Sequence, residues 1–154
     1  MSVLAPAEND DDLPHYVTST GRPVAVPYNG SVARLNVGFR STRRVREWIR
    51  NGNFDVMHVH EPLSPSIGAV ALWAAQGPIV ATWHSSMEKS RVLSAGFYLA
   101  QTVMEKTRGR IAVSELARRT LVDHVGGDAV LIPNGVDCAA FADAEPFEGW
   151  PGPG

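Results

Sequence analysis

The chain has 154 residues, of which 44% are hydrophobic, 19% charged and 8% aromatic. This is the composition of one ordinary globular domain with enough apolar residues to form a packed core. Fourteen Lys and Arg against 16 Asp and Glu give a formal charge of -2, which excludes the strong positive field of a typical nucleic-acid-binding domain. Cys138 is the single cysteine, so no internal disulfide can form and a reducing compartment is expected.

Two features of the sequence bear on membranes. The N-terminus reaches an acidic stretch at residues 9–12 and lacks the basic-then-apolar order of a signal peptide. The longest apolar run, residues 67–75, is far shorter than the roughly 20 residues that span a bilayer. We therefore expect a cytoplasmic protein without a transmembrane helix.

Short runs rich in valine and isoleucine predict the strands. Residues 2–5 are predicted to form the first strand, and residues 23–27 an extended segment that ends in a turn at 28–30. The remaining strand candidates are residues 54–60, 78–83, 110–113 and 129–132. Their near lack of charge is typical of strands covered on both faces.

Segments of helical periodicity lie between these runs. Ser41 is predicted to cap a helix that continues through Arg50 and stops at residues 51–52. The other predicted helices are one from Ser64 or Ser66 through Ala75, one over 91–106, and one over 115–124 capped by Ser114. This alternation predicts β-α-β units and a parallel sheet, in the α/β class.

Polar residues follow several predicted strands, where ligands bind in open parallel sheets. His60, Ser114 and Asn134 occupy such positions, but a serine there is more simply a helix cap and an asparagine before glycine a turn. His84 is the stronger candidate, because it ends an apolar strand, precedes two serines and can donate a hydrogen bond whether neutral or charged.

Other chemical motifs are weak. His58 and His60 alternate on one predicted strand and share a face, but no third ligand stands at a recognisable spacing, so no metal site is predicted. The GxxxxGK[ST], GxGxxG and GxSxG motifs are absent. The sequence therefore predicts no self-contained nucleotide site.

The helix around residues 43–50 is amphipathic. Val45, Trp48 and Ile49 share one side, which we expect to pack on the sheet. The other side carries Glu47 and four arginines, Arg43, Arg44, Arg46 and Arg50. This face is either simply solvated or also contacts an anionic membrane surface.

Two phrases of the sequence resemble the N-terminal half of family 4 glycosyltransferases of the GT-B fold. They are residues 54–62, FDVMHVHEP, and residues 132–137, IPNGVD. Within that family, the stretches at 27–35, 77–84 and 109–119 resemble the phosphatidylinositol mannosyltransferases of actinobacteria, and the similarity covers almost the whole chain.

The resemblance implies a Rossmann-like doubly wound parallel sheet. In the family, a first strand and a glycine-rich loop precede the position of Met1. Residues 1–144 are then expected to form an incomplete acceptor-side domain and residues 145–154 a linker or tail, with the donor domain outside the chain.

In that family, a membrane-associated enzyme transfers mannose from GDP-mannose to the inositol ring of phosphatidylinositol with retention of configuration. The resemblance thus implies a peripheral protein on the inner face of the plasma membrane, in phosphatidylinositol mannoside biosynthesis. Without the donor domain, the chain is expected to bind no cofactor and to transfer no mannose alone. A role of Mg²⁺ in the complete enzyme, and a partner chain that supplies the donor domain, stay open.

The resemblance also assigns roles to single residues. Tyr28, Asn29 and Arg34 match the acceptor side, where an aromatic wall, an amide and a guanidinium suit the inositol ring and the lipid phosphate. His84 matches the histidine beside the transferred sugar, where it can support transition-state charge. Further cleft candidates are Lys89, Ser114 and Asn134.

The basic membrane-contact cluster of the family is retained as Arg43, Arg44 and Arg46, whereas Glu47 stands where the family has another basic residue. Two alternatives stay open beside this interpretation. One is a family 4 transferase with a different sugar or acceptor, and the other is a non-catalytic remnant or lipid-binding protein.

Overall fold

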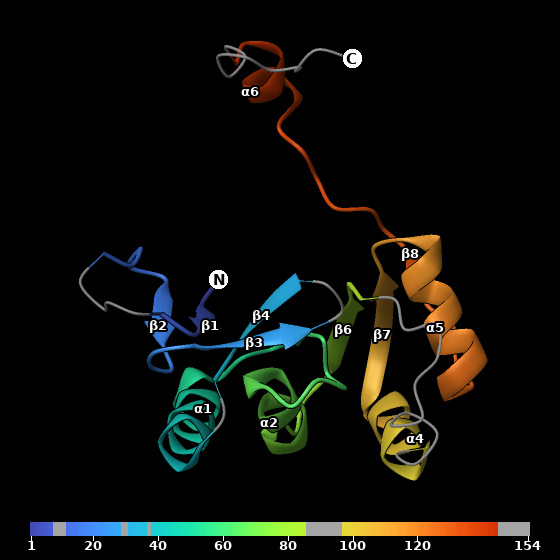
Figure 1. Ribbon diagram of the computed structural model, residues 1–154. Coiled ribbons are helices and arrows are strands. Elements are labelled where there is room, and N and C mark those ends of the chain that lie inside the picture. The colour runs from blue at the N-terminus through green and yellow to red at the C-terminus, as the bar shows by residue number, and fades with distance from the viewer. Residues whose placement is uncertain (8–11, 29–30, 37, 86–96, 145–154) are drawn as a thin grey trace.

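A parallel sheet of four strands forms the centre of the fold. The computed structural model describes residues 1–7, 12–28, 31–36, 38–85 and 97–144 (Figure 1). Its main sheet has the order β5-β6-β7-β8, and all three neighbouring pairs are parallel. The strands are β5 (Met57–His60), β6 (Ile79–Trp83), β7 (Thr107–Ala112) and β8 (Val130–Leu131). The predicted α/β class with a parallel sheet is thereby confirmed.

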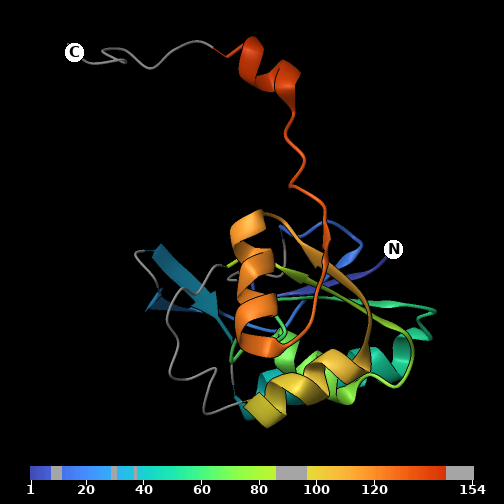
Figure 2. The same cartoon turned by 90° about the vertical axis from the view of Figure 1, so that its right-hand side faces the viewer.

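A helix lies between each pair of successive strands in this sheet. These helices are α2 (Ile67–Ala74), α4 (Phe97–Lys106) and α5 (Glu115–Val125), and α1 (Phe39–Gly52) precedes β5. Figures 1 and 2 show α1, α2 and α4 along one side of the strands. The buried side chains that join the strands to the helices include Val45, Val59, Leu72, Ile79, Val103 and Leu121.

Four further strands lie outside this sheet. β1 (Val3–Ala5) pairs in parallel with β2 (Val17–Ser19), and β3 (Val24–Tyr28) pairs with β4 (Ser31–Leu35) as an antiparallel hairpin. β1 and β3 were predicted from the sequence, whereas β2 and β4 were not. β2 is only three residues long with two hydroxyl side chains, so it carries no apolar run.

The prediction that Ser41 caps α1 is wrong. The helix begins at Phe39 with Gly38 as its N-cap, and the Ser41 hydroxyl instead donates to the Gly38 carbonyl at 3.0 Å. Serine side chains inside a helix commonly bond back to a preceding carbonyl in this way. The helix also continues through Gly52, and Asn53 takes the left-handed conformation at its end with a φ of 44°.

Other predicted helix ends are confirmed. Ser66, not Ser64, caps α2 through a bond accepted from the Gly68 amide. α5 ends at Gly126, whose φ of 73° is a left-handed conformation that glycine adopts without a steric penalty. Of the predicted third helix, the structure describes the part from Phe97 onward.

The segment after β8 leads away from the body of the protein to the short helix α6 (Cys138–Ala142), as both views show (Figures 1 and 2). α6 was not predicted. Among the described helices, none combines the length and the apolar character needed to cross a bilayer.

Candidate functional site

Three histidines meet where β5 and β6 end. His58 and His60 lie on β5, and His84 directly follows β6. Their rings stack in sequence, with centroids 4.6 Å apart between His58 and His60 and 5.1 Å apart between His60 and His84. His60 Nδ1 lies 2.8 Å from His84 Nε2, a hydrogen-bonding distance. We call His58, His60 and His84 the histidine row.

The parallel register of the two strands brings the row together. His60 is paired with Thr82, and side chains two residues apart on a strand share a face. His84 therefore follows Thr82 on the face that carries both strand histidines. His58 Nε2 lies 2.7 Å from the hydroxyl of Thr82, a residue only 4% exposed, so the first ring of the row is fixed to the core of the sheet.

Glu61 ties the ends of the two strands together. One of its carboxylate oxygens accepts hydrogen bonds from the backbone amides of His84 and Ser85, each 2.6 Å long. Its own amide donates to the Thr82 carbonyl and continues the ladder of the sheet. Glu61 adopts a φ of 50°, a left-handed conformation that costs a residue with a side chain about 1–3 kcal/mol. Pro62, which follows, is fully buried.

The electrostatic environment favours neutral rings on β5. Partial removal of water lowers the pKa of His58, and the nearby His84 lowers it further. The pKa of His60 is also lowered, mainly by loss of water and then by His58 and His84, although Glu61 acts in the opposite direction. A proton entering this row is therefore disfavoured on His58 and His60.

The row does not have the form of a metal centre. The ring nitrogens of His60 and His84 contact each other directly, whereas ligands of zinc each lie about 2.0–2.1 Å from the ion. Within the described ranges, no group of three or more His, Cys, Asp or Glu side chains is arranged to hold a metal. The arrangement is instead that of hydrogen-bonding groups at an open edge of a sheet.

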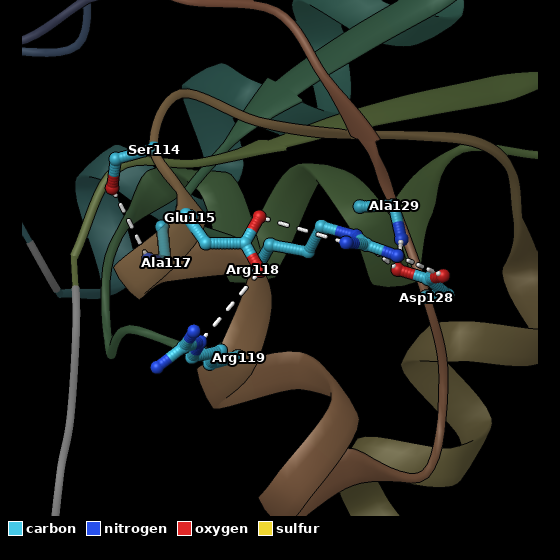
Figure 3. Close-up of polar contacts among 7 residues, drawn as sticks. All are labelled: Ser114, Glu115, Ala117, Arg118, Arg119, Asp128 and Ala129. Carbon is cyan, nitrogen blue, oxygen red and sulfur yellow. Dashed lines mark hydrogen bonds and ion pairs between the residues drawn. The ribbon is translucent and has the colours of Figure 1, made fainter.

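Ser114 acts as the cap of α5. Its hydroxyl accepts a hydrogen bond from the Ala117 amide at 3.2 Å, in agreement with the simpler of its two interpretations (Figure 3). Farther along α5, Arg118 donates to both carboxylate oxygens of Asp128 at 2.7 Å and holds the pKa of that carboxyl below its usual range. Glu115 lies within 3.6 Å of Arg118 and Arg119. The arginines of α5 are thus paired with acids of their own region.

The other predicted residues lie on other elements than the histidine row or outside the described part. Tyr28 lies on β3 next to the turn of the hairpin, and Arg34 lies on β4. Asn134 is exposed in the segment after β8. Asn29 and Lys89 lie outside the described residues.

The predicted basic face of α1 is present, with one internal ion pair. Arg43 donates to Glu47 at 2.8 Å, and its side chain is 72% exposed. Val45 on the opposite side is fully buried, which confirms the predicted packing face. Two hollows on the described chain include residues of α1, Arg46 in one and Arg44 in the other, and neither contains His84.

Glu61 is the contact that sequence reasoning missed. It lies in the phrase FDVMHVHEP at residues 54–62, but nothing in the sequence pattern assigned it a role. An acid between a strand-ending histidine and a proline was the available signal, because such a residue lies level with the end of the next parallel strand. Its left-handed backbone and its two amide partners could not be deduced from the sequence pattern.

Comparison with known proteins identifies the family. Residues 1–140 match Glycosyltransferase Family 4. The chain is 54% identical over 151 residues to a phosphatidyl-myo-inositol mannosyltransferase of Mycolicibacterium smegmatis. The aligned region covers 98% of this chain and 39% of that protein. The chain is 51% identical to the protein of the same name from Mycobacterium tuberculosis, with 98% and 40% covered. A third, from Propionibacterium freudenreichii, is 31% identical over 99% of this chain and 42% of its own length.

The chain therefore spans about two fifths of the length of the curated relatives it matches. The family match covers nearly all of the described body, including the histidine row and the arginine face of α1. Together with the alternating strands and helices, these matches place the chain in Glycosyltransferase Family 4.

Proposed function

We propose that this chain forms the acceptor-side part of an enzyme that transfers mannose from GDP-mannose to the inositol ring of phosphatidylinositol, with retention of configuration. The observation that carries the proposal is the 54% identity over 98% of the chain to a protein named phosphatidyl-myo-inositol mannosyltransferase. The polar carboxyl edge of β5 and β6 supports it, because ligands of open α/β sheets bind at that edge.

His84 is the catalytic residue of this proposal. Its ring extends from the end of β6 and is exposed, so a sugar at the edge of the sheet can reach it. A histidine N–H placed beside the reacting centre stabilises negative charge as the sugar–phosphate bond breaks. The Glu61 carboxylate accepts hydrogen bonds from the amides of His84 and Ser85 and thereby holds the backbone that carries this ring.

The acceptor is bound on the hairpin side. Tyr28 and Arg34, with Asn29 between their strands, supply an aromatic surface, a guanidinium and an amide, which suit an inositol phosphate. Lys89, Ser114 and Asn134 are further candidate residues of the cleft in this proposal, and Lys89 lies outside the described residues. Arg43, Arg44 and Arg46 contact the anionic membrane surface at the inner face of the plasma membrane, where the lipid is found.

The proposal is tested in a chimaera in which this chain replaces the matching 39% of the Mycolicibacterium smegmatis relative. We expect the chimaera to transfer radiolabelled mannose from GDP-mannose to vesicles that contain phosphatidylinositol. Vesicles with the same charge from phosphatidylserine serve as the control for the acceptor. Transfer to neither lipid, equal transfer to both lipids, or transfer from another sugar nucleotide only would contradict the proposal.

Membrane contact is tested on the 154-residue chain by co-sedimentation with anionic vesicles. We expect binding that weakens as salt rises and is reduced in the triple variant Arg43→Gln, Arg44→Gln, Arg46→Gln. The control is Arg118→Gln with Arg119→Gln, which removes arginines of α5 that are paired with Glu115 and Asp128. Binding that ignores salt and survives the triple substitution would contradict membrane contact through α1.

A further inference from the structure

We propose that His60 and Glu61 are positioning residues for His84: His60 fixes the ring in the tautomer with its proton on Nδ1, and Glu61 fixes the backbone that carries the ring. This inference rests on the proposed function for its catalytic meaning, since His84 is the residue placed beside the sugar. The arrangement itself stands on contacts between β5 and the end of β6, whatever the substrate.

The contact between His60 Nδ1 and His84 Nε2 permits two tautomers of His84, and the proposal selects the one in which His60 donates. His84 Nε2 faces His60 Nδ1 at 2.8 Å, so one of these two nitrogens carries the shared proton. When His60 donates, neutral His84 must hold its own proton on Nδ1. That nitrogen lies on the other side of the ring and points away from His60, so His84 presents an N–H donor outward. A donor is the group that developing negative charge requires.

The surroundings of His60 suit a neutral ring, which is the form that the proposed donor role requires. His60 is stacked between the rings of His58 and His84, and a positive charge there would face both of them. Glu61 is the adjacent acid, but its carboxylate is engaged by two backbone amides. The lowered pKa of His60 agrees with this geometry and keeps the ring neutral near pH 7.

Glu61 supplies the second constraint. Its carboxylate accepts the amides of His84 and Ser85, consecutive groups just beyond the last residue of β6. Bonds to an ionised acceptor are stronger than neutral ones, and two of them on one oxygen restrict the direction in which the chain leaves the strand. The left-handed backbone at Glu61 places the side chain where it reaches both amides. The ring of His84 is thus held from its backbone and from its Nε2.

The test is nitrogen NMR of the 154-residue chain labelled with ¹⁵N-histidine. We expect the Nδ1 of His84 to be the protonated nitrogen at pH 7.5, and a scalar coupling to cross the hydrogen bond from His60 Nδ1 to His84 Nε2. His60→Leu should shift His84 towards the Nε2–H form that free imidazole side chains prefer. His60→Asn, whose amide N–H occupies the place of Nδ1–H, should restore the Nδ1–H form. The matched control is His58→Leu, which removes the other strand histidine but leaves the bond to His84.

The role of Glu61 is tested by measuring amide hydrogen exchange. In Glu61→Ala, the amides of His84 and Ser85 should exchange at least about tenfold faster, as expected for the loss of roughly 1.4 kcal/mol of protection, while amides of α5 stay unchanged. A protonated Nε2 on His84 in the unsubstituted chain overturns the proposal without any variant, as does unchanged exchange in Glu61→Ala. These readouts need neither donor nor acceptor, so an inactive chimaera with the expected spectra would contradict the proposed function alone.

Discussion

Replacement of Glu61 should change stability by an amount that depends on the residue put in its place. Glu61→Ala removes two charge-assisted hydrogen bonds, each contributing about 1.5–3 kcal/mol where the partner stays buried. His84 is exposed and water can replace much of this bonding, so we expect a loss of about 2 kcal/mol in total. The strain at φ 50° does not change, because alanine carries the same penalty there.

Glu61→Gly separates the two effects. Glycine loses the same hydrogen bonds but adopts the left-handed conformation freely, so this variant should be about 1 kcal/mol more stable than Glu61→Ala. Urea unfolding followed by tryptophan fluorescence, to which the buried Trp83 contributes, measures both. The exposed acid Glu105 on α4 gives the control, and Glu105→Ala should stay within about 0.5 kcal/mol of the unsubstituted chain. An unchanged free energy of unfolding in Glu61→Ala would refute the reasoning. So would a Glu61→Gly variant that is no more stable than Glu61→Ala.

Three further outcomes are expected from the same unfolding assay. The lowered pKa values of His58 and His60 mean that folding favours their neutral forms, so stability is present above pH 6.5 and falls as the pH drops through that value; a flat profile from pH 7.5 to 5 would count against this. Leu72→Ala, at a fully buried position, should cost about 2–5 kcal/mol, whereas Val122→Ala on the surface should cost far less. Ser114→Ala should cost about 1 kcal/mol through loss of the α5 cap, and Ser114→Asp should recover most of it.

The main sheet was predictable because its residues carry strong local signals. Uncharged runs such as the one ending at Trp83 predict buried strands, and Ser66 and Ser114 stand where helix caps belong. β4 was missed because Arg34 and Ala33 interrupt its apolar pattern, and hairpin pairing depends on contacts with β3 rather than on local preference. Ser41 misled for a related reason: a serine can cap a helix or bond back within it, and only the preceding Gly38 decides.

The candidate site was predictable in part. The position of His84 after an apolar strand, and the shared face of His58 and His60, follow from strand periodicity. The contact between His60 and His84 depends on the register of β5 against β6, which the sequence pattern leaves undetermined. The hydrogen bonds that Glu61 accepts from two amides depend on a rare backbone conformation, which local propensity does not predict.

The measurement that tests the central claim most directly is the turnover of the chimaera with His84→Ala. The control is His15→Ala, at an exposed histidine that is distant in sequence from the histidine row. We predict that His84→Ala lowers kcat for mannose transfer to phosphatidylinositol by about 100-fold or more, as for loss of a donor to transition-state charge. Vesicle binding should stay unchanged, and His15→Ala should retain full turnover. Equal kcat in the His84→Ala chimaera would contradict the account.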